Sequence, residues 1–211
     1  MDAWRNRGHT MVGMKLYVEG GGDTNLLKTA CRKGFSEFLK KAGVAGKLPR
    51  IVACGSRQNA YDSFCTALAK GERAFLLVDS EGAVDNAPPQ PWQHLANRTG
   101  DQWPKPPTAS DDDCHLMVQV MEAWFLADRQ TLQTFFGQGF QAGALPAVTG
   151  NIETLDKALV YQSLARATSN CKTKAPYGKG EHSFKLLALI DPNRVQRASL
   201  WAKRFIDELK K

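Results

Sequence analysis

The sequence predicts an α/β protein with a mainly parallel sheet, helices on both faces of the sheet and a helical C-terminal layer. Over the first 80 residues, short apolar segments alternate with segments of helical periodicity, which is the pattern of parallel strands joined by right-handed crossovers. Mostly helical segments follow after residue 150. We therefore expect a single domain over residues 1–211, with a core at about 12–137 and a helical layer at about 151–211.

The first strand and helix have clear boundaries in the sequence. Residues 12–18 (VGMKLYV) are apolar and β-branched and run into Glu19 and three glycines, as expected for a buried strand that enters a tight turn. Residues 23–42 then repeat apolar side chains at helical spacing. Either Asp23 or Thr24 is a natural N-cap for this helix.

The same alternation continues toward the third strand. Residues 51–54 form a second short strand candidate, and Gly55 and Ser56 lead from it into a second helix. Residues 74–78 (AFLLV) are entirely apolar, which is typical of a strand buried on both faces, and this strand ends at Asp79.

Residues 80–110 interrupt the alternation with a Pro-rich segment. A connection of this length inside a compact domain is usually a functional lid or a binding loop. Its two tryptophans, Trp92 and Trp103, either stack on nucleic-acid bases or anchor the loop on the sheet. The six prolines of this segment are Pro88, Pro89, Pro91, Pro104, Pro106 and Pro107.

The rest of the chain is predicted to be one strand followed by helices. Residues 115–120 (HLMVQV) indicate a fourth strand, and residues 122–136 indicate an amphipathic helix. Further helices are expected near residues 155–168, 182–190 and 198–210, with a loop at 171–181.

The composition is that of a soluble globular protein. The 211 residues (23.3 kDa) are 43% apolar and 23% charged, and no apolar run approaches the roughly 20 residues that span a bilayer. The N-terminal segment has no apolar stretch of the secretory kind. Five cysteines without a CxxC pair indicate buried thiols in a reducing compartment, in place of a disulfide framework or a zinc site. We expect a cytoplasmic protein that does not act at a membrane.

The net charge of +7 is unevenly distributed along the chain. Residues 1–50 and residues 151–211 each carry a net charge of +6, whereas residues 51–150 carry −5. A solvated basic surface is the common reason for a pI near 9.2. The segregation favours a more specific arrangement, in which a basic rim follows the phosphates of a nucleic acid around an acidic centre.

Three acidic residues follow predicted strands. Glu19 comes after the first strand, and Asp79 and Glu81 come at the end of the third. In an open parallel sheet, ligands bind outside the carboxyl ends of the strands, so these carboxylates are expected at one edge. Gathered carboxylates repel one another unless a cation lies between them, and oxygen-only ligands select a hard ion, either Mg²⁺ or Mn²⁺. Each acid taken alone is equally a strand-end residue bonded to local backbone.

Gly20, Gly21 and Gly22 directly follow the first of these carboxylates. They allow a sharp turn and present bare amide groups beside a helix N-terminus, where phosphates bind well. The segment lacks the Gly-Lys-Ser/Thr of a Walker loop, and Asn25 stands where a dinucleotide-binding fingerprint has its third glycine. Turn geometry alone is an equally good reason for the glycines.

The order of these residues resembles the Toprim domain that topoisomerases, bacterial primases and OLD-type nucleases share. The resemblance rests on an apolar strand followed by Glu19 and Gly20, and on a later apolar strand followed by Asp79-x-Glu81. In the Toprim domain, a glutamate and a later acidic pair, usually Asp-x-Asp, surround Mg²⁺. Here Glu81 replaces the second aspartate, which keeps the charge and lengthens the ligand.

Two further stretches extend the resemblance over nearly the whole chain. Residues 117–128 (MVQVMEAWFLAD) and 177–183 (YGKGEHS) are similar to those of a compact bacterial Toprim-like family of unknown function. That family includes the effector of the PARIS anti-phage system, which partners an ABC-type ATPase. The resemblance implies an Mg²⁺-dependent nuclease of phage defence that cleaves RNA, tRNA in particular, although nothing in these residues chooses RNA over DNA.

The resemblance also implies roles for the acidic residues. Glu19 is expected to act as general acid/base or metal ligand, with Asp79 and Glu81 as metal ligands. Glu122 either binds a second ion, or holds a metal ligand in place, or is a helix-start glutamate favoured by the helix dipole.

Basic residues near the C-terminus are the candidates for phosphate contacts. Lys179, in a Gly-rich loop, is our first choice for a catalytic lysine that neutralises the scissile phosphate or the leaving oxygen. Lys172 and Lys174 either contact phosphates or form a solvated basic loop. His182 is either a proton donor that contacts phosphate or a helix cap.

The favoured function is therefore metal-dependent cleavage of nucleic-acid phosphodiesters. One alternative is a partner-binding module that docks on an ABC-type ATPase and does not catalyse. Another is a phosphohydrolase for a small phosphate ester or nucleotide. Self-pairing into a homodimer is compatible with the nuclease.

Overall fold

The fold is built on four parallel strands in the order β2-β1-β3-β4. The computed structural model describes residues 13–44, 46, 48–84, 90–148 and 150–211. The strands are β1 (Lys15–Val18), β2 (Arg50–Ala53), β3 (Ala74–Asp79) and β4 (Cys114–Met117). Both neighbours of β1 pair with it in parallel, so the direction in which the chain fills the sheet reverses between β1 and β3.

The two helices that connect the first three strands are α1 (Asn25–Lys41) and α2 (Arg57–Ala69). Thr24 is the N-cap of α1, and its hydroxyl accepts a hydrogen bond from Leu27 N at 3.2 Å. Ser56 caps α2 in the same way through Asn59 N at 3.1 Å. Each cap satisfies one backbone donor that the first turn of a helix leaves open.

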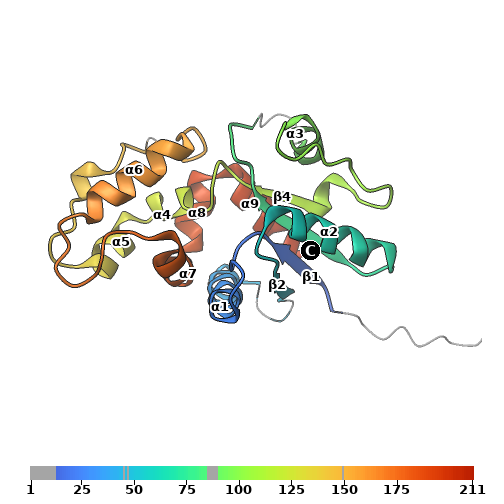
Figure 1. The fold of residues 1–211 in the computed structure, drawn as a ribbon, viewed down its shortest axis with the longest axis horizontal. Helices are drawn as coiled ribbons and strands as arrows, with labels where there is room; N and C mark the ends of the chain where they lie inside the picture. The colour runs from blue at the N-terminus through green and yellow to red at the C-terminus, as the bar shows by residue number, and fades with distance from the viewer. Residues whose placement is uncertain (1–12, 45, 47, 85–89, 149) are drawn as a thin grey trace, which may run out of the picture.

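Side chains on the two faces of the sheet belong to separate apolar cores. Leu16, Val18 and Leu77 face the core that contains α1, whereas Leu76 and Val78 face the core that contains α2. This alternation follows from the two-residue period of a strand. Helices therefore cover both faces, and the predicted α/β class with a helical C-terminal region is confirmed (Figure 1).

Helices α4 to α7 extend the molecule to one side of the sheet, and α8 and α9 return to it (Figure 1). Helix α5 packs against α7, and the last helix, α9, packs on β4. The helices after the third strand are α3 (Pro91–Asn97), α4 (Ala123–Leu126), α5 (Arg129–Phe136), α6 (Lys157–Thr168), α7 (Lys179–Leu189), α8 (Pro192–Ala198) and α9 (Leu200–Lys210), with short 3-10 turns at Asp111–Asp113 and Ala142–Ala144.

Several predicted boundaries were wrong. The expected strand at 115–120 ends at Met117, and the expected helix at 122–136 is the two helices α4 and α5. The break falls at Asp128, because its carboxylate caps α5 and also accepts a hydrogen bond from Asp191 N at 2.9 Å. Helix α8 was not predicted, and α7 begins at Lys179, inside the expected loop at 171–181.

The Pro-rich segment is partly structured. Its prediction as a loop missed α3, which starts with Pro91 at a position where the missing N–H costs nothing. Trp92 donates to Ser110 O at 2.8 Å, and Trp103 donates to Gln58 Oε1 at 3.0 Å while stacking on Tyr61. Both indoles are buried and therefore anchor the segment on the α2 face of the sheet. Pro88 and Pro89 lie outside the described residues.

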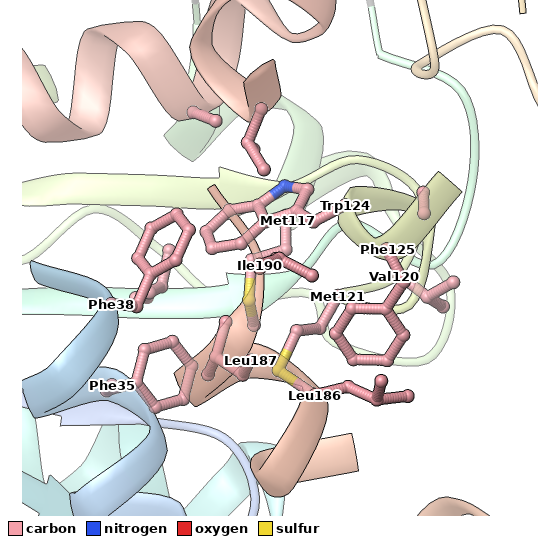
Figure 2. Close-up of a cluster of buried hydrophobic side chains, with 14 of the residues drawn as sticks. Phe35, Phe38, Met117, Val120, Met121, Trp124, Phe125, Leu186, Leu187 and Ile190 are labelled. Carbon is pink, nitrogen blue, oxygen red and sulfur yellow. The ribbon is translucent and has the colours of Figure 1, made fainter. Parts of the chain in front are cut away.

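Helices α1 and α7 pack closely against each other. Gly34 on α1 lies against the backbone of Phe184 on α7, and a Cβ at Gly34 would be 2.8 Å from Phe184 O. Apolar side chains seal this contact, and Figure 2 shows how they meet residues from the segment after β4. The labelled side chains are Phe35, Phe38, Met117, Val120, Met121, Trp124, Phe125, Leu186, Leu187 and Ile190.

We predict that Gly34→Ala destabilises the fold. Alanine inside a helix is usually about 1 kcal/mol better than glycine, but here the new methyl group meets the backbone of α7. The expected loss is about 1–3 kcal/mol, as for overpacked cores, and urea unfolding measures it. Gly180→Ala is the matched control, because its Cβ would meet only Leu27 Cδ2 at 4.0 Å. A Gly34→Ala protein as stable as the wild type would contradict this close packing.

Candidate functional site

Two carboxylates meet where the strand order reverses. Glu19 directly follows β1, and Asp79 is the last residue of β3, the neighbouring strand. Glu19 N donates to Leu77 O at 3.1 Å, which continues the ladder and keeps Glu19 in register with the end of β3. Crevices at this point of a parallel sheet are where such folds bind ligands.

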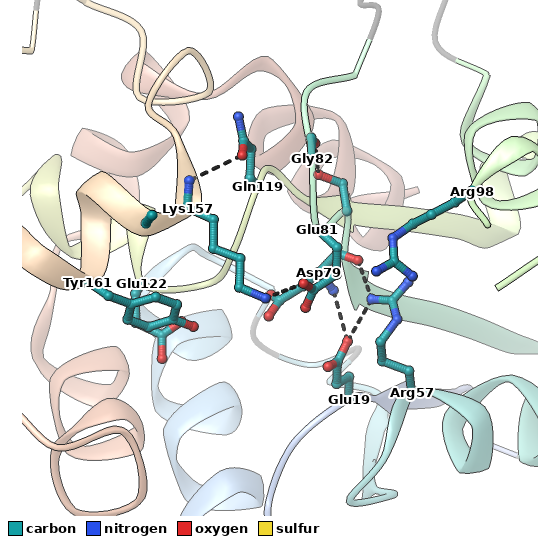
Figure 3. A network of polar contacts seen from close by, with 12 residues as sticks. Glu19, Arg57, Asp79, Glu81, Gly82, Arg98, Gln119, Glu122, Lys157 and Tyr161 are labelled. Carbon is teal, nitrogen blue, oxygen red and sulfur yellow. Dashed lines mark hydrogen bonds and ion pairs between the residues drawn. The ribbon is translucent and has the colours of Figure 1, made fainter. Parts of the chain in front are cut away.

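The Glu19 carboxylate is fixed by two donors. Its Oε2 accepts a hydrogen bond from Asp79 N at 3.2 Å and another from Arg57 Nη1 at 2.9 Å (Figure 3). Burial raises the pKa of Glu19, and the positive charge of Arg57 opposes that rise. The first strand-end carboxylate is thus half-buried and paired with one cation.

Arg57 is a site residue that the sequence analysis missed. It opens α2, and its guanidinium also donates to the backbone oxygen of Asp79 and to both carboxylate oxygens of Asp101. The guanidinium lies 5.2 Å from the centre of the Trp103 ring. This fork geometry and the stacking surface suit arginine and not lysine. The sequence signal was its place directly after a strand and a helix cap.

Asp79 is the most buried member of the group. It is only 3% exposed, and its Oδ1 accepts a hydrogen bond from Met121 N at 2.8 Å. Burial first, and then the negative charges of Glu19 and Glu122, raise the pKa of Asp79 well above its usual value. Among the residues that the structure describes, no basic side chain forms an ion pair with Asp79.

Glu81 joins the group from a strained turn. Its φ of +62° is a left-handed conformation that non-glycine residues rarely adopt. Glu81 N donates to Gln119 O at 2.8 Å, which holds the turn against the segment after β4. The Glu81 carboxylate forms an ion pair with Lys157 at the start of α6. Lys157 was not predicted as a site residue.

These three carboxylates fit a divalent metal ion. Glu19, Asp79 and Glu81 each offer one oxygen, and the three oxygens lie within 4.8 Å of one another. Within the described part of the chain, Glu19 Oε1 and Asp79 Oδ2 accept no hydrogen bond, so both oxygens are available. Hard divalent cations favour an all-oxygen set of this kind. The group can therefore hold a metal.

A cavity of about 350 Å³ opens beside Glu19 and Asp79. Gly20, Gly21 and Gly22 line it, and their role in binding phosphate stays a prediction. Gly21 has a φ of +87°, and a Cβ there would lie 2.9 Å from the Cα of Lys28, so no larger residue fits. The remaining lining residues are Leu27, Gly55, Met117, Met121, Glu122, Lys179, Gly180, Ser183 and Phe184.

A second hollow of about 550 Å³ lies beside Glu81. It is lined by polar side chains, among them Gln93, Asn97 and Arg98 from α3 and the residue that follows it. Both hollows border the same carboxylate edge, one through Glu19 and Asp79 and the other through Glu81.

Glu122 lies at the back of the smaller cavity and is fully buried. Three hydroxyl groups hold its carboxylate: Tyr177 at 3.0 Å and Ser183 at 3.2 Å donate to Oε1, and Tyr161 donates to Oε2 at 3.1 Å. It is not among the three residues whose ligand oxygens gather within 4.8 Å. Hydroxyl groups therefore fix the Glu122 carboxylate in place, and Glu122 is not part of the three-carboxylate group.

Lys179 is the first residue of α7 and lines the same cavity. Its Nζ donates to Tyr161 Oη at 3.1 Å. Burial acts to lower the pKa of Lys179, but the charges of Glu122 and Asp79 outweigh it and raise that pKa above the usual value. Lys179 is therefore an ammonium ion at neutral pH, and it faces the carboxylate edge.

Comparison with known proteins identifies the family. The chain matches the model of the family described as Domain of unknown function (DUF4276) over residues 18–210. The chain belongs to the DUF4276 family. No curated protein matches it, and no solved structure does. The matched range includes Glu19, Asp79, Glu81, Glu122 and Lys179, so the whole site lies inside the DUF4276 region.

The other predicted phosphate contacts lie elsewhere in this DUF4276 chain. His182 is buried among Phe135, Phe136 and Tyr177, and its Nδ1 accepts from Gly178 N at 3.0 Å, which caps α7. Burial lowers the pKa of His182. Lys172 and Lys174 are exposed on the loop before α7 and do not line the cavity, and Lys174 Nζ sits over the Phe135 ring at 4.8 Å.

The sequence did not predict the hydroxyl groups that surround Glu122. Tyr177 and Ser183 belong to the stretch YGKGEHS that the sequence analysis singled out, but no role was assigned to either. Tyr161 comes from α6 and carries no local signal.

In the described part of the DUF4276 chain, no helix is both long and apolar enough to cross a bilayer.

We predict that Asp79→Asn stabilises the metal-free protein. Because folding raises the pKa of Asp79, its charged form opposes folding, and stability falls as the pH rises from about 4 through the raised value. Asparagine keeps the acceptor for Met121 N without the charge. At pH 8 with a chelator, we expect a gain of about 1 kcal/mol or more, since one pKa unit corresponds to about 1.4 kcal/mol.

Urea unfolding at pH 5 and pH 8 measures this effect. The gain should shrink at the lower pH, because Asp79 of the wild type is then increasingly protonated in the folded state. Asp62→Asn, an exposed carboxylate on α2, is the control and should leave stability within about 0.5 kcal/mol. A metal-free Asp79→Asn protein less stable than the wild type at pH 8 would refute the assignment of Asp79 as a strained buried charge.

Proposed function

We propose that this DUF4276 protein is a metal-dependent nuclease that cleaves nucleic-acid phosphodiesters. The observation that carries the proposal is the gathering of Glu19, Asp79 and Glu81 within 4.8 Å at the reversal point of a parallel sheet. This arrangement supports the Toprim-like interpretation of the sequence. The fold alone carries no argument for catalysis, whereas the donor set does.

The charge balance of the site supports a divalent cation and a phosphate. Among the described residues, five carboxylates, those of the three ligands, Glu122 and Asp101, face four cations, Arg57, Arg98, Lys157 and Lys179. One negative charge remains, and it lies with Asp79. A divalent cation would turn this balance to one positive charge, which matches a single phosphodiester group.

Glu19, Asp79 and Glu81 would hold Mg²⁺ or Mn²⁺. The ion supplies charge stabilisation on a phosphodiester oxygen and a more acidic bound water. Glu19 is the residue for general acid/base work, because burial raises its pKa toward the working range of a proton carrier. Lys179 presents an ammonium group from the opposite wall of the cavity, where it can neutralise phosphate charge.

A polymer is favoured over a small phosphate ester because hollows flank the carboxylates on two sides. A nucleic-acid strand that crosses the carboxylate edge has room for one neighbouring nucleotide beside Glu81 and another beside Gly20. The basic ends of the chain, including exposed Lys172 and Lys174, would follow its phosphates. We propose RNA as the polymer, and tRNA in particular, from the resemblance alone.

The resemblance also supplies the proposed biological setting. We propose an effector of phage defence in the cytoplasm, restrained by an ABC-type ATPase and able to pair with itself. The five free thiols of the chain accord with the cytoplasmic location. A non-catalytic module that docks on such an ATPase, or a small-molecule phosphohydrolase, would give different results in the two experiments below.

We predict that Mg²⁺ or Mn²⁺ raises the melting temperature of the wild-type protein. An ion that binds only the folded state at about 100 times its Kd adds about 2.7 kcal/mol. Asp79→Asn should abolish this response, because it removes the carboxylate that has no ion-pair partner. Glu122→Gln is the matched control: it is a buried carboxylate of the same cavity that hydroxyls hold, and it should keep most of the response. Equal loss in both variants would assign Glu122 to the metal as well.

We predict metal-dependent cleavage of nucleic acid by the purified chain. RNA, tRNA and DNA are incubated with Mg²⁺ or Mn²⁺, and the products are separated by gel electrophoresis. Glu19→Ala should lower the rate at least about 100-fold, because it removes a metal ligand and a proton carrier. Undiminished cleavage in this variant would sink the mechanism. Hydrolysis of small phosphate esters without cleavage of any polymer would favour the phosphohydrolase, and tight ATPase binding without either activity would favour the docking module.

A further inference from the structure

The helices after β4, α4 to α9, form the helical half of the molecule, and besides Lys157 they bring Lys179 to the carboxylate edge through a defined chain of contacts. Lys179 Nζ donates to Tyr161 Oη at 3.1 Å, and Tyr161 donates its own proton to Glu122 Oε2 at 3.1 Å. Nζ is 5.6 Å from the centre of the Tyr161 ring and lies beyond the hydroxyl, so the hydroxyl makes the contact. One tyrosine hydroxyl thus joins the lysine to Glu122.

Glu122 is buried, and hydroxyl groups surround its carboxylate. A carboxylate with no exposed surface is costly unless donors surround it, and here three hydroxyls donate to its two oxygens. Tyr177 Oη and Ser183 Oγ are 2.7 Å apart, and Ser183 Oγ also donates to the backbone oxygen of Lys179. The negative charge of Glu122 raises the pKa of Lys179.

Tyr161 and Tyr177 differ in whether they contact Lys179. Both donate to Glu122, Tyr161 to one oxygen and Tyr177 to the other. Tyr161 also accepts a hydrogen bond from Lys179, whereas no such contact joins Tyr177 to that lysine within the described residues. Burial and the nearby Glu122 charge raise the pKa of both phenols, so each stays protonated and keeps its donor role.

We propose that Tyr161 and Glu122 are positioning residues that hold the Lys179 ammonium toward the carboxylate edge. Tyr161 relays the negative charge of Glu122, and the pair keeps Lys179 from swinging out to solvent or folding onto Asp79. The role of this lysine toward a phosphate rests on the proposed nuclease function. The contact that orients it is a property of the folded chain and can be measured without any activity.

The experiment measures the reactivity of Lys179 toward acetic anhydride in the full-length protein, by mass spectrometry of the acetylated peptides. Only a deprotonated and accessible amine reacts. Tyr161→Phe removes one hydroxyl and keeps the ring, so Lys179 should react roughly tenfold faster, the change expected for loss of one hydrogen bond to a charged group. Lys172 in the same sample is exposed and should react at an unchanged rate.

Tyr177→Phe is the matched control. This variant removes the tyrosine hydroxyl that donates to the other oxygen of Glu122. It should change the acetylation rate of Lys179 less than about twofold. Glu122→Gln removes the charge and should act in the same direction as Tyr161→Phe. Equal effects of the two tyrosine variants, or no effect of Tyr161→Phe in a protein whose thermal melt is unchanged, would overturn the proposal.

The cleavage assay separates this inference from the proposed function. If both hold, Tyr161→Phe lowers kcat on nucleic acid with little change in KM, while Tyr177→Phe keeps most of the rate. Faster acetylation of Lys179 in a chain that cleaves no polymer would leave the positioning pair standing and the nuclease refuted. Unchanged acetylation in a chain that cleaves would refute the positioning pair alone.

Discussion

Repulsion among carboxylates at one edge of the sheet is the constraint on which the rest of the structure depends. Three acids at the strand ends have ligand oxygens within 4.8 Å of one another, and a fourth acid, the fully buried Glu122, lines the same cavity as two of them. Such a group is stable only if positive charge reaches it. The cations come from three separate helices: Arg57 opens α2, Lys157 opens α6 and Lys179 opens α7. The carboxylates at the sheet edge are therefore paired with cations from the sheet region, through α2, and from the helices after β4, through α6 and α7.

The helices after β4 therefore do more than cover the core, because they also bring charged and polar groups to the carboxylates. Helix α7 must approach α1 closely for Lys179 to reach the cavity, and Gly34 makes that approach possible because it places no side chain against Phe184. Helix α6 contributes Tyr161 and Lys157, which contact two different carboxylates. A substitution at the α1–α7 contact would thus act on stability and on the site at once.

Much of the sheet could be predicted from the sequence, and so could part of the site. Periodicity and strand-end position placed Glu19 and Asp79 together, because parallel strands end at the same edge whatever their distance in sequence. The partners of these carboxylates could not be found in this way. Arg57 and Lys157 act through long-range contacts, 38 and 76 residues from the carboxylates they pair with, and their positions at helix starts do not show which carboxylates those are. Helix α3 was missed because Pro at a first helical position looks like a loop signal.

Glu122 shows why counting acids does not locate a metal. In the sequence it is a fourth carboxylate after a strand, equivalent to the others, and in the structure hydroxyl groups donate to both of its oxygens. Glu19 shares Arg57 with Asp101, and Glu81 pairs with Lys157. Asp79 is left with a backbone donor and a pKa raised well above its usual value. The case for a divalent ion therefore rests on three ligand oxygens that gather around this carboxylate, which has no ion-pair partner among the described residues.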